Sequence, residues 1–253
     1  MIIRKCKEAF VFIEQHDHAR VSGDLFTYLA DHLMVDSKWR KEVEFAIYQH
    51  DCGWIPFDQN PFWDDAKNEP FSFSSFPRST KTVLYEYGIN KVEKESKYAA
   101  LLCSKHYSSF LDKHPNELVK QFVTNEKTRQ SRLKEEIPLF DEDLFAKHSK
   151  LLTFFDDLSL YLCLNEPGVK KEKEHHFFTD GIQTPSYFGM DSLAVEWLSN
   201  NQLTVSDNIF KHNFTIELKQ KVIPKSSILQ MGLNEAYITA KEEKINITIK
   251  KSA

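Results

Sequence analysis

Two kinds of hydrophobic periodicity divide the chain. Between residues 14 and 164, apolar positions recur every three to four residues, which predicts amphipathic helices. Toward both ends of the chain, apolar and polar positions alternate, which is typical of strands. The predicted helices cover residues 18–34, 38–51, 80–88, 95–111, 115–136 and 140–164, and the predicted strands lie within 2–14, 214–218 and 245–249.

These patterns predict a mainly α protein in which the N-terminal and C-terminal segments form a small β element. Residues 165–176 are polar and charged, so we expect a boundary there. It divides the chain into a helical domain with N-terminal strands (1–164) and a linker with a β-rich appendage packed on that domain (165–253). Residues 52–80 contain prolines interleaved with aromatic residues, which predicts a loop.

Composition narrows the class of protein. The chain has 253 residues, of which 41% are hydrophobic and 28% are charged, as in ordinary globular proteins. Its net charge of -4 argues against a protein that coats nucleic acid. No segment approaches the ~18 uninterrupted apolar residues of a membrane helix. The four cysteines lack C-x-x-C spacing and the first residues lack a signal-peptide pattern, so we expect a reduced, cytoplasmic protein.

Four of the predicted helices carry a histidine or an aspartate on the apolar face. Burying such groups without compensation costs free energy, and ordinary core residues would each need a separate hydrogen-bonding partner. One metal site shared by the four helices compensates all of them. The residues concerned are His18, the adjacent pair His50-Asp51, His106 and Asp156.

This pattern resembles the HD-domain superfamily of metal-dependent phosphohydrolases. That superfamily has a histidine on an early helix, an adjacent His-Asp pair on the next helix and an aspartate on a late helix. Here the late segment at 155–159 resembles the superfamily's terminal segment and favours Asp156 over Asp157 as the ligand. The resemblance implies an HD-like helical bundle with His18, His50, Asp51 and Asp156 as metal ligands.

A second resemblance is to an uncharacterised bacterial family related to these hydrolases. It rests on Gln-His-Asp before Gly-Trp at 49–54, Leu-x-x-x-His at 102–106 and Asp-x-Leu-Ser-Leu at 156–160. Together the two resemblances cover roughly residues 14–164. The C-terminal region lies outside both resemblances, so neither of them implies an activity for it.

The residue types suit hydrolysis of a phosphate ester by a metal-activated water. Imidazole and carboxylate ligands accept Fe, Mn, Zn or Mg, as one ion or two per chain. With two ions, Asp51 is expected to bridge them and His106 to bind the second ion. With one ion, His106 contacts the substrate or donates a proton to the leaving group. The sequence leaves both arrangements open.

Several neighbours of these residues are candidates for the substrate pocket. Arg20 follows His18 and can contact a phosphate through its guanidinium, which makes it a candidate catalytic residue, and Lys105 precedes His106. The ordinary alternative for both is surface charge. Trp54 and Phe57 follow the His-Asp pair and either line the pocket or pack over the bundle.

The expected substrate is a nucleotide or another small phosphorylated metabolite. We expect no membrane partner and no extended nucleic acid, and a homodimer through the C-terminal sheet is compatible with the sequence. Two other functions remain open. One is a non-catalytic metal-containing binding or sensing protein, and the other is a di-iron oxygenase.

Overall fold

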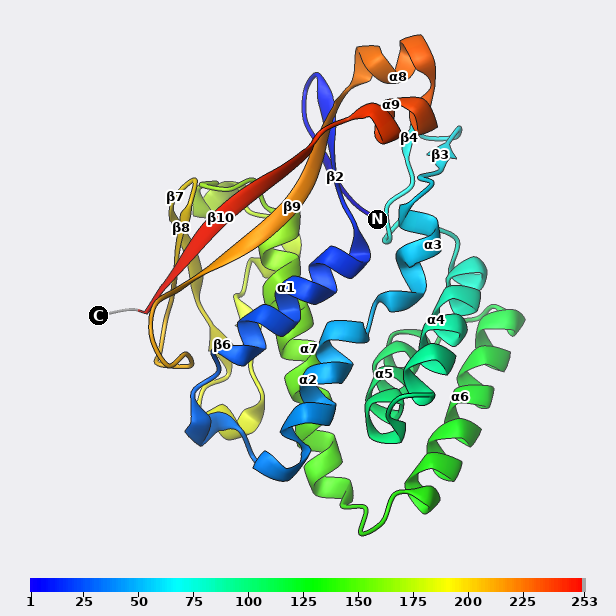
Figure 1. Cartoon of the computed structure of the whole chain (residues 1–253), viewed down its shortest axis with the longest axis vertical. Helices are drawn as coiled ribbons and strands as arrows, with labels where there is room; N and C mark the ends of the chain where they lie inside the picture. The colour runs from blue at the N-terminus through cyan, green and yellow to red at the C-terminus, as the bar shows by residue number, and fades with distance from the viewer. Residues whose placement is uncertain (252–253) are drawn as a thin grey trace.

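The computed structural model describes residues 1–251; residues 252 and 253, at the end of the predicted appendage, lie outside the described part. Within residues 1–251, a helical body packs beside a curled six-stranded sheet (Figure 1). The prediction of a mainly α, HD-domain-like bundle with a small β element is therefore wrong. The fold is mixed α/β, with 20% of the residues in strands.

The sheet joins the two ends of the chain. All neighbouring strands in it are antiparallel except β8 and β10, which are parallel. The N-terminal hairpin enters the sheet through β2 and β9, where Phe10 lies opposite Ile223. In spatial order the strands are β1 (Ile2–Lys5), β2 (Ala9–Ile13), β9 (Phe214–Pro224), β10 (Glu242–Lys251), β8 (Gln202–Val205) and β7 (Val195–Ser199).

Charged residues explain why the sequence pattern underestimates this sheet. The apolar alternation of β9 gives way to a polar stretch from Lys219, and β10 begins with charged residues at Glu242. These charges face one another across the two strands: Lys219 lies 3.9 Å from Glu242, and Lys244 lies 3.2 Å from Glu217. Cross-strand pairs of opposite charge stabilise pairing where no apolar pattern is visible.

Seven helices precede the C-terminal part of the sheet in the chain, and polar caps set where three of them begin. The side chains of Ser96, Asn116 and Asp141 accept hydrogen bonds from backbone N–H groups in the first turns of α5, α6 and α7. The helices are α1 (Gln15–Thr27), α2 (Arg40–Gln49), α3 (Ile55–Asp58), α4 (Arg78–Glu93), α5 (Lys97–Leu111), α6 (Glu117–Glu136) and α7 (Glu142–Leu164).

The packing of these helices brings the inward faces of four of them together. Helix α1 follows β2 directly and packs against α2 and α7, while α5 packs against α2, α4, α6 and α7 (Figure 1). Helix α1 ends at Thr27, before the predicted end at residue 34, and the chain then turns so that Leu29 forms a β-bridge with Phe210.

The segment between α2 and α4 places α4 beside the His50-Asp51 pair. Gly53 lies so close to α4 that a Cβ atom there would come within 2.1 Å of the Leu84 carbonyl oxygen. Any larger residue at position 53 would therefore force α4 away. Where the sequence predicts only a loop, the segment contains a 3₁₀ turn (Cys52–Trp54), α3, and the short strands β3 (Trp63–Asp64) and β4 (Glu69–Pro70).

One apolar cluster connects the helical body with the sheet. It includes Phe26 and Phe155 from the helices and Leu203 and Ile216 from the strands, so the predicted helical region and the predicted appendage share it. Helix α7 is followed by the paired strands β5 (Ile182–Gln183) and β6 (Ser192–Leu193). The core thus holds α1 and α7, which carry two of the candidate ligands, against the sheet.

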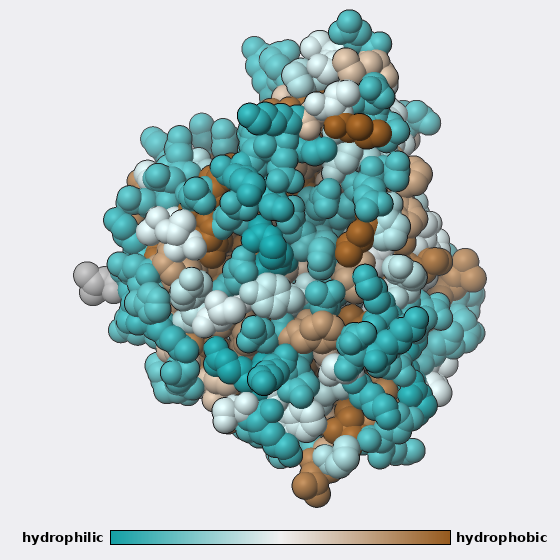
Figure 2. Space-filling view, viewed as in Figure 1, coloured by the Kyte–Doolittle hydropathy of each residue, from teal (hydrophilic) through white to brown (hydrophobic). Residues whose placement is uncertain are grey.

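Helices α8 (Lys225–Met231) and α9 (Leu233–Thr239) form a hairpin that projects from one end of the molecule (Figure 1). Hydrophilic residues cover most of the face shown in Figure 2, and apolar residues form only small groups on that face, one of them on this projection. Among the helices in residues 1–251, none is both long and apolar enough to cross a membrane.

Candidate metal centre

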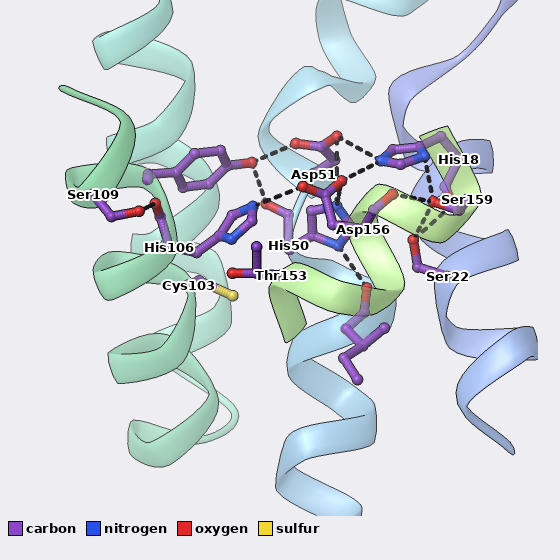
Figure 3. A network of polar contacts seen from close by, with 12 residues as sticks. His18, Ser22, His50, Asp51, Cys103, His106, Ser109, Thr153, Asp156 and Ser159 are labelled. Carbon is purple, nitrogen blue, oxygen red and sulfur yellow. Dashed lines mark hydrogen bonds and ion pairs between the residues drawn. The ribbon is translucent and has the colours of Figure 1, made fainter. Parts of the chain in front are cut away.

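Five ionisable side chains from four helices point toward one another in the helical body (Figure 3). His18 comes from α1, His106 from α5 and Asp156 from α7, while His50 and Asp51 directly follow the last residue of α2. Their exposed fractions lie between 1% and 6%. The structure thus brings together all five residues that the sequence pattern placed on inward faces.

The distances between the imidazole nitrogens and the carboxylate oxygens are of the size found around a bound cation. Asp156 Oδ1 lies 2.8 Å from His18 Nε2 and 3.4 Å from His50 Nε2. Asp51 Oδ2 lies 3.8 Å from His18 Nε2 and 3.7 Å from His50 Nε2. Atoms bound about 2.1 Å from one ion in tetrahedral or octahedral geometry lie roughly 3.0–3.4 Å apart. The observed distances bracket that range.

The five residues form two overlapping groups, each with ligand atoms within 4.8 Å of one another. His18, His50 and Asp51 make the first group, and His50, His106 and Asp156 make the second. Both use His50, but this ring offers only one nitrogen because its Nδ1 donates to the Ile47 carbonyl oxygen at 2.7 Å. The two groups therefore cannot both be complete at the same time.

The two carboxylates face different surroundings. Both oxygens of Asp156 face imidazoles, because Oδ1 contacts His18 and His50 while Oδ2 lies 3.3 Å from His106 Nε2. By contrast, Asp51 Oδ1 accepts a hydrogen bond from the Tyr107 hydroxyl at 2.6 Å, which leaves only Oδ2 for the cluster. Asp156, and not Asp51, is therefore the carboxylate placed to reach both ends of the cluster.

A further layer of hydrogen bonds orients these ligands. Ser159 Oγ donates to the Asp156 carbonyl oxygen at 2.9 Å and accepts from His18 Nδ1 at 2.6 Å. His18 therefore turns its other nitrogen toward the cluster (Figure 3). Gln15 Nε2 donates to Asp51 Oδ2 at 2.9 Å, so the Asp51 carboxylate is held from both sides.

The electrostatics of the cluster call for a positive charge. His50 Nε2 is buried and has no hydrogen-bond partner among the described residues, although it faces Asp51 and Asp156. Burial opposes a charged ring, but the two carboxylates outweigh this and raise the pKa of His50 to about 9. Burial likewise opposes the charge of Asp156, but the three imidazoles that face it hold its pKa well below the usual range. Either a proton or a metal ion meets this need, and the donor set of imidazoles and carboxylates fits a divalent metal.

The cluster forms part of the wall of a cavity of about 380 Å³. All five candidate ligands line it, so the site is open to a small molecule. Next to them, burial and the charge of Asp156 raise the pKa of Asp157 to about 7. The wall also includes Trp54, Arg78, Lys81, Tyr85, Phe110 and Phe177.

Of the predicted pocket residues, the structure brings only Trp54 to this cavity. Arg20 lies outside it and is bound by Asp17 at 3.3 Å and by Asp24 at 2.7 Å. Lys105 is exposed and does not line the cavity. Phe57 packs against the rings of Phe62 and Phe76 instead.

Sequence reasoning missed Tyr107, Arg78 and Lys81. Tyr107 follows His106 directly, and no pattern in the sequence indicates that its hydroxyl contacts Asp51. Arg78 and Lys81 begin α4 immediately after the aromatic loop, with the i, i+3 spacing that puts two side chains on one helix face. That spacing next to the loop was the available signal.

Comparison with known proteins places this site in a family. A family model described as "Protein of unknown function (DUF3891)" matches residues 1–225. The chain belongs to the DUF3891 family. No curated protein and no solved structure matches this DUF3891 chain significantly. The matched region contains all five candidate ligands, and the family description assigns no activity to them.

Proposed function

We propose that this DUF3891 protein is a divalent-metal-dependent hydrolase of a small phosphate ester. One observation carries the proposal: a buried His/Asp cluster with metal-like spacing forms the wall of a cavity that a small molecule can enter. The resemblance of the same residues to the HD-domain hydrolases supports this reaction.

The geometry favours one tightly held ion. The atoms of Asp51 and Asp156 both lie within 3.8 Å of His18 Nε2 and His50 Nε2, and His50 has no second nitrogen to offer to another ion. A bound divalent ion would supply an acidified water molecule and would neutralise charge on a phosphoryl oxygen. Ser159, Tyr107 and Gln15 keep the ligands in place, so the site needs little rearrangement to bind the ion.

Within this one-ion site, His106 does not bind the metal and is available to protonate the leaving group. Hydrolysis breaks the bond between phosphorus and the alcohol oxygen, and that oxygen must gain a proton. His106 lines the cavity, with its Nε2 3.3 Å from Asp156 Oδ2. We therefore assign His106 as the proton donor and Asp156 as both a metal ligand and the group that orients this imidazole.

Metal analysis combined with turnover on a substrate panel tests the proposal. The metal-loaded full chain should release phosphate from 4-nitrophenyl phosphate or from members of a nucleotide and sugar-phosphate panel. Asp51→Ala should lose both metal and turnover. Asp31→Ala, at a carboxylate that is 80% exposed, should keep both.

Two results would contradict the proposal. Bound metal with no turnover on any phosphoester would favour a non-catalytic binding or sensing role. Iron-dependent consumption of oxygen would favour an oxygenase.

A further inference from the structure

Two cations of α4 lie in the wall of the metal cavity without anionic partners. Arg78 forms no hydrogen bond or ion pair within residues 1–251, and Lys81 donates only to the Phe73 carbonyl oxygen, at 2.5 Å. Both cations are therefore free to bind an anion that enters the cavity.

The surroundings of Lys81 hold its side chain at the cavity. The close contact of Gly53 with α4 fixes that helix beside the residues that follow His50-Asp51. Phe73, which accepts the hydrogen bond from Lys81, is itself fixed because its N–H donates to the Met1 carbonyl oxygen at 2.8 Å. Lys81 is thus directed by its own helix and by the facing loop.

The two cations disfavour each other. Burial, with the charge of Arg78 added to it, lowers the pKa of Lys81 to about 8. A dianion placed between the two side chains would relieve this repulsion and would gain charge-assisted hydrogen bonds from both. Asp51 and Asp156, which also line the cavity, face the imidazoles of the candidate metal site.

Aromatic rings form the rest of the wall around these cations. Trp54 and Tyr85 are buried, and Tyr85 is held rigid because it stacks on Tyr107 with 3.9 Å between ring centroids. Phe110 and Phe177 are about half exposed at the same cavity, at 52% and 53%. Rings exposed at a cavity rim offer a surface on which another ring can pack. The cavity volume lies at the lower end of small-molecule sites.

We propose that Arg78 and Lys81 bind the phosphate dianion of a phosphomonoester, and that the aromatic wall selects esters whose alcohol part carries an aromatic ring. This inference rests on the proposed function and names the substrate class for the same site. Compounds of this class include aryl phosphates and nucleoside monophosphates.

Binding of inorganic phosphate tests the cation pair without requiring turnover. In calorimetric titrations of the metal-loaded full chain, Arg78→Gln and Lys81→Met should each weaken phosphate binding about tenfold or more. Both variants should keep the metal content of the unmodified protein. Lys91→Met, on the exposed side of the same helix, is the matched control and should bind phosphate normally.

Substrate selection tests the aromatic wall. The KM for 4-nitrophenyl phosphate should lie below that for glycerol 3-phosphate, and Phe110→Ala should raise only the former. Equal phosphate affinity in Arg78→Gln, Lys81→Met and Lys91→Met would overturn the inference while leaving hydrolysis intact. Phosphate binding that depends on Arg78 and Lys81 in a protein without turnover would instead overturn the proposed function and keep the anion site.

Discussion

The two ends of the cluster of candidate ligands are held in different ways. At one end, His18 is fixed through Ser159 and lies 2.8 Å from Asp156 Oδ1. At the other end, His106 Nδ1 is buried without a hydrogen-bond partner in residues 1–251, and its ring contacts the half-exposed Phe110 at 4.6 Å between centroids. A ligand with a fixed tautomer suits permanent metal binding, whereas a ring with a free nitrogen suits proton transfer. The contrast suggests one metal position and one acid-base position.

Replacing Asp156 has the largest expected effect, because this carboxylate contacts the histidines at both ends of the cluster. Asp156→Asn removes the charge that three imidazoles share, so metal affinity should fall more than about a hundredfold. Elemental analysis after dialysis measures this. Asp157→Asn is the matched control, and loss of metal in that variant alone would mean that the neighbouring carboxylate is the ligand.

Replacing the histidine at each end of the cluster, one at a time, separates the roles of His18 and His106. His18→Gln should lower metal affinity about a hundredfold, because it removes a ligand. His106→Gln should change metal affinity less than about tenfold but should lower kcat for esters with poor leaving groups. Equal loss of metal in both variants would make His106 a ligand of the same ion.

His148, a buried histidine of α7 away from the carboxylates, gives a contrast in pH dependence. Burial lowers its pKa to about 4, and its Nδ1 lies 2.7 Å from the Tyr98 hydroxyl. The unfolded chain, with a histidine pKa near ~6.5, binds more protons between these values, so acidification should destabilise the fold there. The free energy of unfolding should fall by about 3 kcal/mol between pH 6.5 and 4 on account of this residue.

Urea denaturation at pH 6.5 and pH 4 measures that loss. His148→Gln, whose amide can still accept from Tyr98, should reduce the difference between the two pH values. An unchanged difference would show that His148 is not the group responsible.

The smallest expected effect concerns the hydrogen bond to Asp51. Tyr107→Phe removes the donor to Oδ1, so metal affinity should fall about tenfold, the lower end of the range for residues that orient ligands. Tyr85→Phe, which keeps the stacked ring, is the control. Calorimetric metal titration distinguishes the two, and equal affinities would leave Gln15 as the group that orients Asp51.

Helical periodicity was sufficient to find the residues that cluster in the structure. Each of His18, His50, His106 and Asp156 shares a face with apolar residues that are buried in the structure, so a single rule of spacing located them. Proximity in sequence misled the choice of pocket residues. Arg20 is two positions from His18, and two positions rotate a side chain about 200° around the helix, away from the cluster. Lys105 points outward for the same reason, about 100° from His106.

The sheet was harder to predict because its longest strands carry charges. The pairing of Lys219 with Glu242 depends on residues far apart in the chain, and no local pattern records it. The position of α4 could not be predicted either. Gly53 approaches the backbone of Leu84, which is 31 residues away in the sequence, and no local pattern records that contact. Arg78 and Lys81 therefore became candidates only once α4 was placed.

The order of strands in the sheet has a consequence for how this protein can be shortened. The family match ends at residue 225, inside the chain segment that separates β9 from β10. Yet β10 lies between β9 and β8, so a chain cut at the family boundary would lose a central strand, and the β7–β8 hairpin would lose its hydrogen bonds to the rest of the sheet. An expression fragment that keeps every candidate ligand would still leave two open sheet edges, which favours aggregation.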